Sequence, residues 1–197
     1  MKFRMLAVAA AMALSAGAHA SSVLFTDDFN SDTQGLNAVP TGWTIGNTGT
    51  VDIIGGNPSA FFDELPGNGN YIDLDGSNGT AGLLETSLSV AAGTYTATFS
   101  LGGNNRDGVT DSVTVWFGGT ELTPVPSVAS ASGFTTYSVT TTTTGGPLTL
   151  SFLDGRDGNV GALLDNVTIS AVPEPGSLSL MLAGFAALAV VARRRRS

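Results

Sequence analysis

The feature that most constrains the fold is a run of residues that alternates strictly between apolar and polar side chains. In the segment GTYTATFSL, residues 93–101, Tyr, Ala, Phe and Leu occupy every second position, and threonine and serine stand between them. A period of two places one set on each face of an extended strand. The segment therefore predicts a β-strand with one face buried and one face in solvent.

The same period recurs along most of the chain, which predicts an all-β protein. The further segments, some less regular, are residues 50–56, 71–76, 82–90, 111–119, 134–144, 147–155 and 161–170. Turn signals rich in Gly, Asn and Asp separate them, and the chain has 26 glycines. Short strands at this spacing favour two sheets packed face to face. The threonine run in 140–144 also suits a glycosylated stalk, but its alternation favours a strand.

The N-terminal 20 residues have the layout of a secretory signal peptide. Lys2 and Arg4 precede an apolar stretch at 5–14, and small residues end in Ala18-His19-Ala20. We expect cleavage after Ala20 and export of the remainder. An uncleaved anchor helix is the alternative, but the apolar stretch is shorter than the roughly 20 residues that a membrane span needs.

The residue types that remain after this cleavage exclude several classes of enzyme. His19 is the only histidine, and the chain has no cysteine. Neither a Ser-His-Asp nor a Cys-His arrangement can form, nor a zinc site with imidazole or thiolate ligands.

The central part of the chain is strongly acidic. Residues 21–171 hold fifteen Asp and Glu residues against Arg106 and Arg156, a net charge of −13. Such a surface excludes nucleic acid as a partner, because phosphates bind to basic surfaces. Carboxylates without nitrogen or sulfur ligands favour Ca²⁺, although acidic solubility explains most of these charges equally well.

One carboxylate is predicted to point inward. Asp165 in LLDNVTIS shares its parity with Leu163, Val167 and Ile169, which we expect to face the core. A buried carboxylate is unfavourable unless it is paired or binds an ion. We therefore expect Asp165 to be a ligand of a structural Ca²⁺.

Two further carboxylates, Asp27 and Asp28, lie on the predicted first strand. First and last strands are often neighbours in closed sandwiches, so Asp28 is expected to meet Asp165 at the same ion. An exposed acidic strand end is an equally open reading of these two residues.

The segment DLDGSNG, from Asp73, begins like an EF-hand loop but fails that template, because Leu84 and not Glu stands at the twelfth position. A turn is the favoured reading. Asp73 and Asp75 are predicted to lie on one outward face, opposite Ile72 and Leu74. They do not form the separated, differently buried acid pair of a glycoside hydrolase, and we predict that the protein is not an enzyme.

Trp116 is the candidate for ligand stacking. Val113, Val115 and Phe117 have the core parity, so Trp116 is predicted to point outward. An outward indole on a sheet can stack on a sugar ring. Coverage by a neighbouring loop is the structural alternative.

The C-terminal residues form a three-part segment. A Pro-Glu-Pro motif is followed by an apolar run at 178–192 and four arginines; the residues are Pro173, Glu174, Pro175, Arg193, Arg194, Arg195 and Arg196. As a single helix the run spans about 22 Å, less than the ~30 Å hydrocarbon core of a membrane. The arginines would hold its end in the cytoplasm. These features predict a temporary membrane anchor.

The segment from 172 to 197 resembles the PEP-CTERM sorting signal of Gram-negative bacteria. This resemblance implies recognition by an exosortase and transient anchoring in the inner membrane. Delivery to the cell surface or to an extracellular matrix rich in exopolysaccharide, as in biofilm or floc, would follow. The expected domains are a signal peptide at 1–20, a β-sandwich at 21–171 and the sorting signal at 172–197.

The segments NYIDLDGSNG, AAGTYTATFSLGGNN and GALLDNVTIS resemble jelly-roll domains related to carbohydrate-binding modules and galactose-binding-like sandwiches. This resemblance implies a two-sheet jelly roll and supports Asp165 and Asp28 as calcium ligands. We predict a non-catalytic, exported envelope or matrix protein that binds polysaccharide. The alternatives are a purely structural matrix protein and an envelope glycoside hydrolase.

Overall fold

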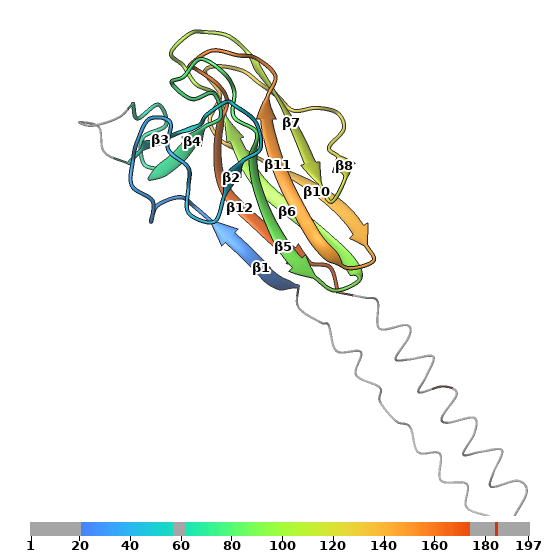
Figure 1. The fold of residues 1–197 in the computed structure, drawn as a ribbon. Coiled ribbons are helices and arrows are strands. Elements are labelled where there is room, and N and C mark those ends of the chain that lie inside the picture. The colour runs from blue at the N-terminus through green and yellow to red at the C-terminus, as the bar shows by residue number, and fades with distance from the viewer. Residues whose placement is uncertain (1–20, 57–61, 174–183, 185–197) are drawn as a thin grey trace, which may run out of the picture. The chain divides into compact units, whose positions relative to one another are not determined.

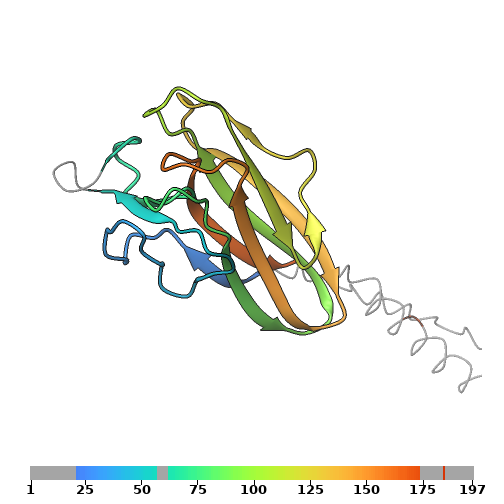
Figure 2. The same cartoon turned by 45° about the horizontal axis from the view of Figure 1, so that its top comes forward.

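The computed structural model describes residues 21–56, 62–173 and 184. Ser21–Val172 form one compact unit. Two antiparallel six-stranded sheets lie face to face in this unit, as Figures 1 and 2 show from two directions. The predicted all-β, two-sheet sandwich is confirmed.

The first sheet, called sheet 1, has the order β10-β6-β12-β4-β3, and β1 also pairs with β12. The neighbours β6 and β12 are long and central, so the last strand of the sandwich is also one of its most buried. The strands of sheet 1 are β1 (Ser22–Asp27), β3 (Asp52–Gly55), β4 (Asn70–Asp73), β6 (Gly93–Gly102), β10 (Thr135–Thr143) and β12 (Leu163–Ala171).

The second sheet, called sheet 2, has the order β2-β5-β11-β7-β8, and β9 also pairs with β7. Its strands are β2 (Thr44–Ile45), β5 (Leu84–Val90), β7 (Asp111–Phe117), β8 (Thr120–Glu121), β9 (Ser127–Val128) and β11 (Gly146–Asp154). The strands β2, β8 and β9 have two residues each, too few for an alternating pattern, so the sequence does not predict them.

The main core fills the space between the sheets with the apolar residues of the alternating segments. Phe99 from β6 and Phe152 from β11 meet edge to face, with ring centroids 4.9 Å apart, and join the two layers. Trp43 packs against Phe152 and against Phe29. The period-two pattern therefore faces the core as predicted.

The threonine run belongs to β10, which confirms the strand reading over the stalk. Thr140 and Thr142 hydrogen-bond across to Thr96 and Thr94 of β6 on the outer face of sheet 1. These solvent-exposed hydrogen bonds between threonine hydroxyls stabilise the pairing of β10 with β6.

A β-bulge interrupts β12 and changes which face Asp165 occupies. Asp165 lies opposite Ser100, whereas Thr168 lies opposite Thr98, so β12 holds one extra residue between them. Asn166, within this bulge, has a left-handed backbone with φ of 52°. Asp165 therefore shares the outer face of sheet 1 with Ser100, while Ile169, opposite Ala97, faces the core. The predicted common parity of Asp165 with Ile169 is wrong, because a bulge shifts the period by one residue.

The predicted signal helix at 1–20 lies outside the described residues. The same holds for Glu174, Pro175, Arg193–Arg196 and nearly all of the apolar run at 178–192. Within the part of the chain that is described, no helix has the length and hydropathy to cross a membrane.

Candidate functional site

The outer face of sheet 2 carries the stacking candidate within a row of polar residues. Trp116 on β7 is half-buried, while its neighbours Val115 and Phe117 are fully buried, which places its indole on the outer face as predicted. Trp116 lies opposite Ser151 of β11 on one side and Glu121 of β8 on the other.

The row continues across the whole sheet. Ser151 lies opposite Glu85 of β5, and Glu85 lies opposite Thr44 of β2. The row of Thr44, Glu85, Ser151, Trp116 and Glu121, called the Trp116 row below, spans about 19 Å at the usual strand spacing. Its indole offers a stacking surface, and its carboxylates and hydroxyls accept hydrogen bonds from sugar hydroxyls.

Of these five residues, the sequence pattern predicts only Trp116 as a ligand-binding candidate. The alternation in residues 82–90 indicates an outward position for Glu85, whereas Glu121 lies on the two-residue strand β8, which is too short for a pattern to show. Their placement beside Trp116 depends on the order of β5, β11, β7 and β8 in the sheet, which local pattern does not encode.

Asp28 and Asp165, the predicted calcium ligands, lie just after β1 and within its neighbour β12, and the charge of Asp28 acts on Asp165. Strand β1 pairs with β12 along its length, and Asp27 lies opposite Val167. Asp165 is 1% exposed, and within the described part of the chain its carboxylate accepts hydrogen bonds only from Asn166, through the main-chain N at 2.7 Å and Nδ2 at 2.8 Å. Burial and the negative charges of Asp28 and Asp27 raise the pKa of Asp165 to about 6. A cation would relieve this repulsion.

Asp27 is engaged elsewhere. Its Oδ2 accepts a hydrogen bond of 2.8 Å from Trp43 Nε1, and its Oδ1 accepts one from Phe29 N. Asp28 is exposed, and its Oδ1 accepts a hydrogen bond from the main-chain N of Asn30. Hydrogen bonding to the side chain and then to the main chain of Asn30 lowers the pKa of Asp28. Asp27 is thus occupied by Trp43 and Phe29, whereas Asp28 and Asp165 bind only neighbouring residues among those that the structure describes.

A buried ionic network joins the loops at one end of the sandwich. Asp73, at the end of β4, is fully buried and pairs with Arg106 of the β6–β7 loop at 3.2 Å. It also accepts hydrogen bonds from Asn104 Nδ2 at 2.8 Å and from Gly161 N at 2.9 Å. The three loops that carry these residues follow β4, β6 and β11, and they meet at the top of the sandwich in Figure 1.

The predicted outward position of Asp73 and Asp75 is wrong. Both are 0% exposed, although Ile72 and Leu74 on the opposite face are buried as well. The alternation was read correctly, but the loops after β6 and β11 cover the second face. Neither carboxylate can reach a substrate.

Among the described residues, no three Asp, Glu or His side chains gather closely enough to hold a metal ion by themselves. A cation at any pair of carboxylates here must complete its shell with main-chain carbonyls and water, as Ca²⁺ commonly does.

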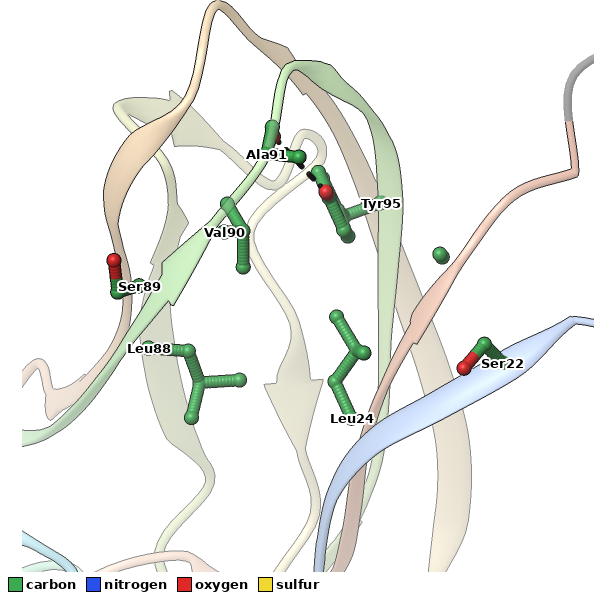
Figure 3. Close-up of a pocket in the computed structure, with 8 residues that line it drawn as sticks. Ser22, Leu24, Leu88, Ser89, Val90, Ala91 and Tyr95 are labelled. Carbon is green, nitrogen blue, oxygen red and sulfur yellow. Dashed lines mark hydrogen bonds between the residues drawn. The ribbon is translucent and has the colours of Figure 1, made fainter.

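A cavity of about 430 Å³ opens at the edge of the sandwich between β1 and β5. Its lining consists of Ser22, Leu24, Leu88, Ser89, Val90, Ala91, Tyr95 and Ala171. Figure 3 shows Leu24, Leu88 and Val90 directed into this space, and the Tyr95 hydroxyl donates to Ala91 O at 3.0 Å. Among the described residues this lining is mainly apolar: Ser22, Ser89 and Tyr95 contribute hydroxyls, and no charged side chain takes part.

Comparison with known proteins identifies the C-terminal segment. Residues 171–196 match the PEP-CTERM protein-sorting motif. No curated protein matches the chain significantly.

Several solved structures share the fold of the sandwich. The CBM22-1 xylan-binding domain from Paenibacillus barcinonensis Xyn10C is 15% identical, with a TM-score of 0.52 over 79% of this chain and 97% of that one. The K1 cleaved adhesin domain of Lys-gingipain from Porphyromonas gingivalis W83 is 14% identical, with a TM-score of 0.51 over 77% of this chain and 99% of that one. A family 35 carbohydrate binding module from Clostridium thermocellum is 17% identical, with a TM-score of 0.47 over 75% and 99%. The chain thus carries a PEP-CTERM protein-sorting motif at its C-terminus, after a jelly-roll sandwich with the fold of carbohydrate-binding modules.

Proposed function

We propose that this protein is an exported, non-catalytic component of the cell envelope or extracellular matrix that binds polysaccharide. The sorting motif at 171–196 supports export, anchoring in the inner membrane and processing by an exosortase. The fold shared with a xylan-binding domain is compatible with sugar binding but does not identify a sugar. The Trp116 row is the observation that carries the proposal.

The geometry of this row suits an extended sugar chain. The indole of Trp116 covers the apolar face of one ring, while Glu121 and Glu85 lie on its two sides across the sheet. Ser151, 6% exposed, forms the floor between Trp116 and Glu85. Flat sheet faces accept long polymers without requiring a chain end, which suits a matrix polysaccharide better than a small sugar.

The same geometry argues against the hydrolase alternative. Glu85 and Glu121 are separated by β11 and β7, about 14 Å at the usual strand spacing. Glycoside hydrolases place their two carboxyl groups roughly 5 to 9.5 Å apart around the scissile bond. Trp116 occupies the space between these two acids, so the row is built for binding.

The test is retention of the full-length protein on immobilised polysaccharides, with xylan, cellulose, β-glucans and bacterial exopolysaccharide as the panel. We expect Trp116→Ala to reduce affinity about tenfold, since stacking of an aromatic ring contributes roughly 0.5–1.5 kcal/mol and the apolar area that it buries adds to this. Trp116→Phe keeps an aromatic face and should retain most of the affinity.

Thr140→Ala is the matched control, because Thr140 is exposed on the outer face of the opposite sheet. Loss of binding in Thr140→Ala as large as in Trp116→Ala would place the site elsewhere. No retention of the unaltered protein on any polymer would favour the purely structural matrix role.

We also propose that Asp28 and Asp165 hold a structural Ca²⁺. The support is a buried Asp165 without a cationic partner and with the charge of Asp28 beside it. Calcium would stabilise the folded state by mass action, raising Tm in Ca²⁺ and lowering it in chelator. An Asp165→Asn variant that keeps the full calcium response would contradict this assignment.

A further inference from the structure

A second carboxylate, Asp75, is buried without a hydrogen-bond partner among the residues that the structure describes. It is 0% exposed, and neither Oδ1 nor Oδ2 makes a hydrogen bond within this part of the chain. The Gly158 N–H lowers the pKa of Asp75 but does not reach hydrogen-bond geometry. Taking an ionised carboxylate out of water with nothing to replace the water is strongly unfavourable.

Another buried acid stands beside it. Asp154, at the end of β11, is 3% exposed and faces the same glycine: a Cβ added to Gly161 would lie 2.6 Å from Asp75 Cβ and 3.2 Å from Asp154 Oδ2. Asp154 accepts one hydrogen bond per oxygen, from Arg156 N and Ala162 N, both at 3.0 Å. Each of its oxygens keeps a free lone pair.

The arginines nearby are committed to other carboxylates. Arg156 places Nη2 at 2.7 Å from Asp111 and 2.9 Å from Asp107. Arg106 pairs with Asp73. No ion pair therefore reaches Asp75 or Asp154 among the described residues, although both are charged in their ordinary state.

Burial, together with the charges of Asp154 and Asp157, raises the pKa of Asp75 to about 6. Arg156 lowers it only in part. Burial likewise raises the pKa of Asp154 to about 6. The same pocket thus disfavours two negative charges, and a positive charge bound between them would remove the conflict.

We propose that Asp75 and Asp154 form a binding site for a hard divalent cation, Ca²⁺ by the chemistry of its ligands. The donors at this site are carboxylate oxygens, which Ca²⁺ prefers. Glycines at 158 and 161 leave the approach to both acids free of side chains: a Cβ on Gly158 would lie 3.0 Å from Asp75 Oδ2. Asp157, exposed on the same loop, adds negative charge at the entrance.

This site is separate from the pair Asp28 and Asp165. The charges that act on Asp75 come from Asp154, Asp157 and Arg156, whereas those that act on Asp165 come from Asp28 and Asp27. An ion at Asp75 would link the β4–β5 loop to the β11–β12 loop.

The experiment is calorimetric titration of the chelator-stripped full-length chain with CaCl₂ at pH 7.5, together with Tm in Ca²⁺ and in chelator. Asp75→Asn keeps the shape of the side chain and removes its charge. We expect this variant to lose one binding event that Asp165→Asn retains, and to lose part of the rise in Tm. Glu64→Gln, which removes one charge from the loop before β4, is the control and should bind as the unaltered chain does.

A second variant, Asp157→Asn, tests the site even if Asp75→Asn fails to fold. Because Asp157 is exposed, the variant should fold, and we expect its calcium affinity at this site to fall about threefold or more through the lost charge. The proposal is overturned if Asp75→Asn and Asp157→Asn both titrate like the unaltered chain. It is also overturned if Ca²⁺ leaves Tm unchanged while acidification from pH 7 to 5 raises it, since a proton would then neutralise Asp75.

Discussion

Arg106 Nη2 lies 3.2 Å from Oδ2 of Asp73, a carboxylate that is completely buried. Asn104 and Gly161 donate to the same carboxylate, so one acid gathers three loops of the sandwich. Burial raises the pKa of Asp73, and main-chain hydrogen bonds from Gly161 and Asp75 together with the Arg106 charge oppose that rise. The end of the sandwich that carries the long loops is therefore held by charge as well as by apolar packing.

Replacement of Arg106 by Ala should destabilise the protein strongly. Asp73 would keep its neutral donors but lose its counter-ion, and breaking a buried pair costs about 3–5 kcal/mol. Urea unfolding of the full-length chain measures the change. Asn105→Ala, an exposed neighbour in the same loop, should have almost no effect; an equal loss there would show that the loop, and not the ion pair, is responsible.

The hydrogen bond from Trp43 to Asp27 predicts a graded series. Trp43→Phe keeps much of the packing against Phe152 and leaves Asp27 Oδ2 without its donor, which costs about 1–3 kcal/mol. Trp43→Ala also opens a cavity beside Phe29 and should cost roughly 3–5 kcal/mol. Thermal unfolding measures the loss of stability in each variant. In both variants Trp116 is the remaining tryptophan, and its fluorescence reports unfolding. If Trp43→Phe matched the unaltered chain, the hydrogen bond would have no energetic role.

Gly49 is predicted to tolerate no side chain. A Cβ at this position would lie 2.0 Å from the carbonyl oxygen of Ala81, where Thr50 and Ala81 form a β-bridge. Gly49→Ala must displace main chain and should lower Tm by at least several degrees. Gly133→Ala meets nothing within 4 Å and is the matched control. Equal Tm values for the two variants would contradict this close approach.

Processing of the sorting motif predicts the mass of the mature protein. We expect mass spectrometry of surface material to show a chain that starts at Ser21 and ends near Pro175. Alanine at Pro173, Glu174 and Pro175 should leave the chain uncut and held in the membrane fraction. Mature surface protein that still carries Arg193–Arg196 would refute processing.

The strands were the most predictable part of this fold. Each segment with a period of two over six or more residues became a strand, because this alternation puts the apolar side chains of an extended chain on one face. Trp116 followed the same rule, and its outward position was correct. The strands β2, β8 and β9 have two residues each, too few for a period to show.

The candidate sites were only partly predictable. Asp165 is buried, as its position in the sequence predicted. The predicted face was wrong: one extra residue at the bulge places Asp165 on the outer face of sheet 1, whereas Ile169 faces the core. Asp73 and Asp75 looked exposed because a strand pattern carries no information about a loop that folds over it.

By itself the sequence determined the all-β class, the main strands, the outward indole and the sorting motif, because each depends on residues close together in the chain. Only the tertiary structure decided which strands are neighbours, and with them the row of Glu85, Ser151 and Trp116. It also decided that Asp75 and Asp154, 79 positions apart in the chain, share one buried space. The physical reason is that burial and electrostatics depend on distance through space, and loops that cover a sheet can come from any part of the chain.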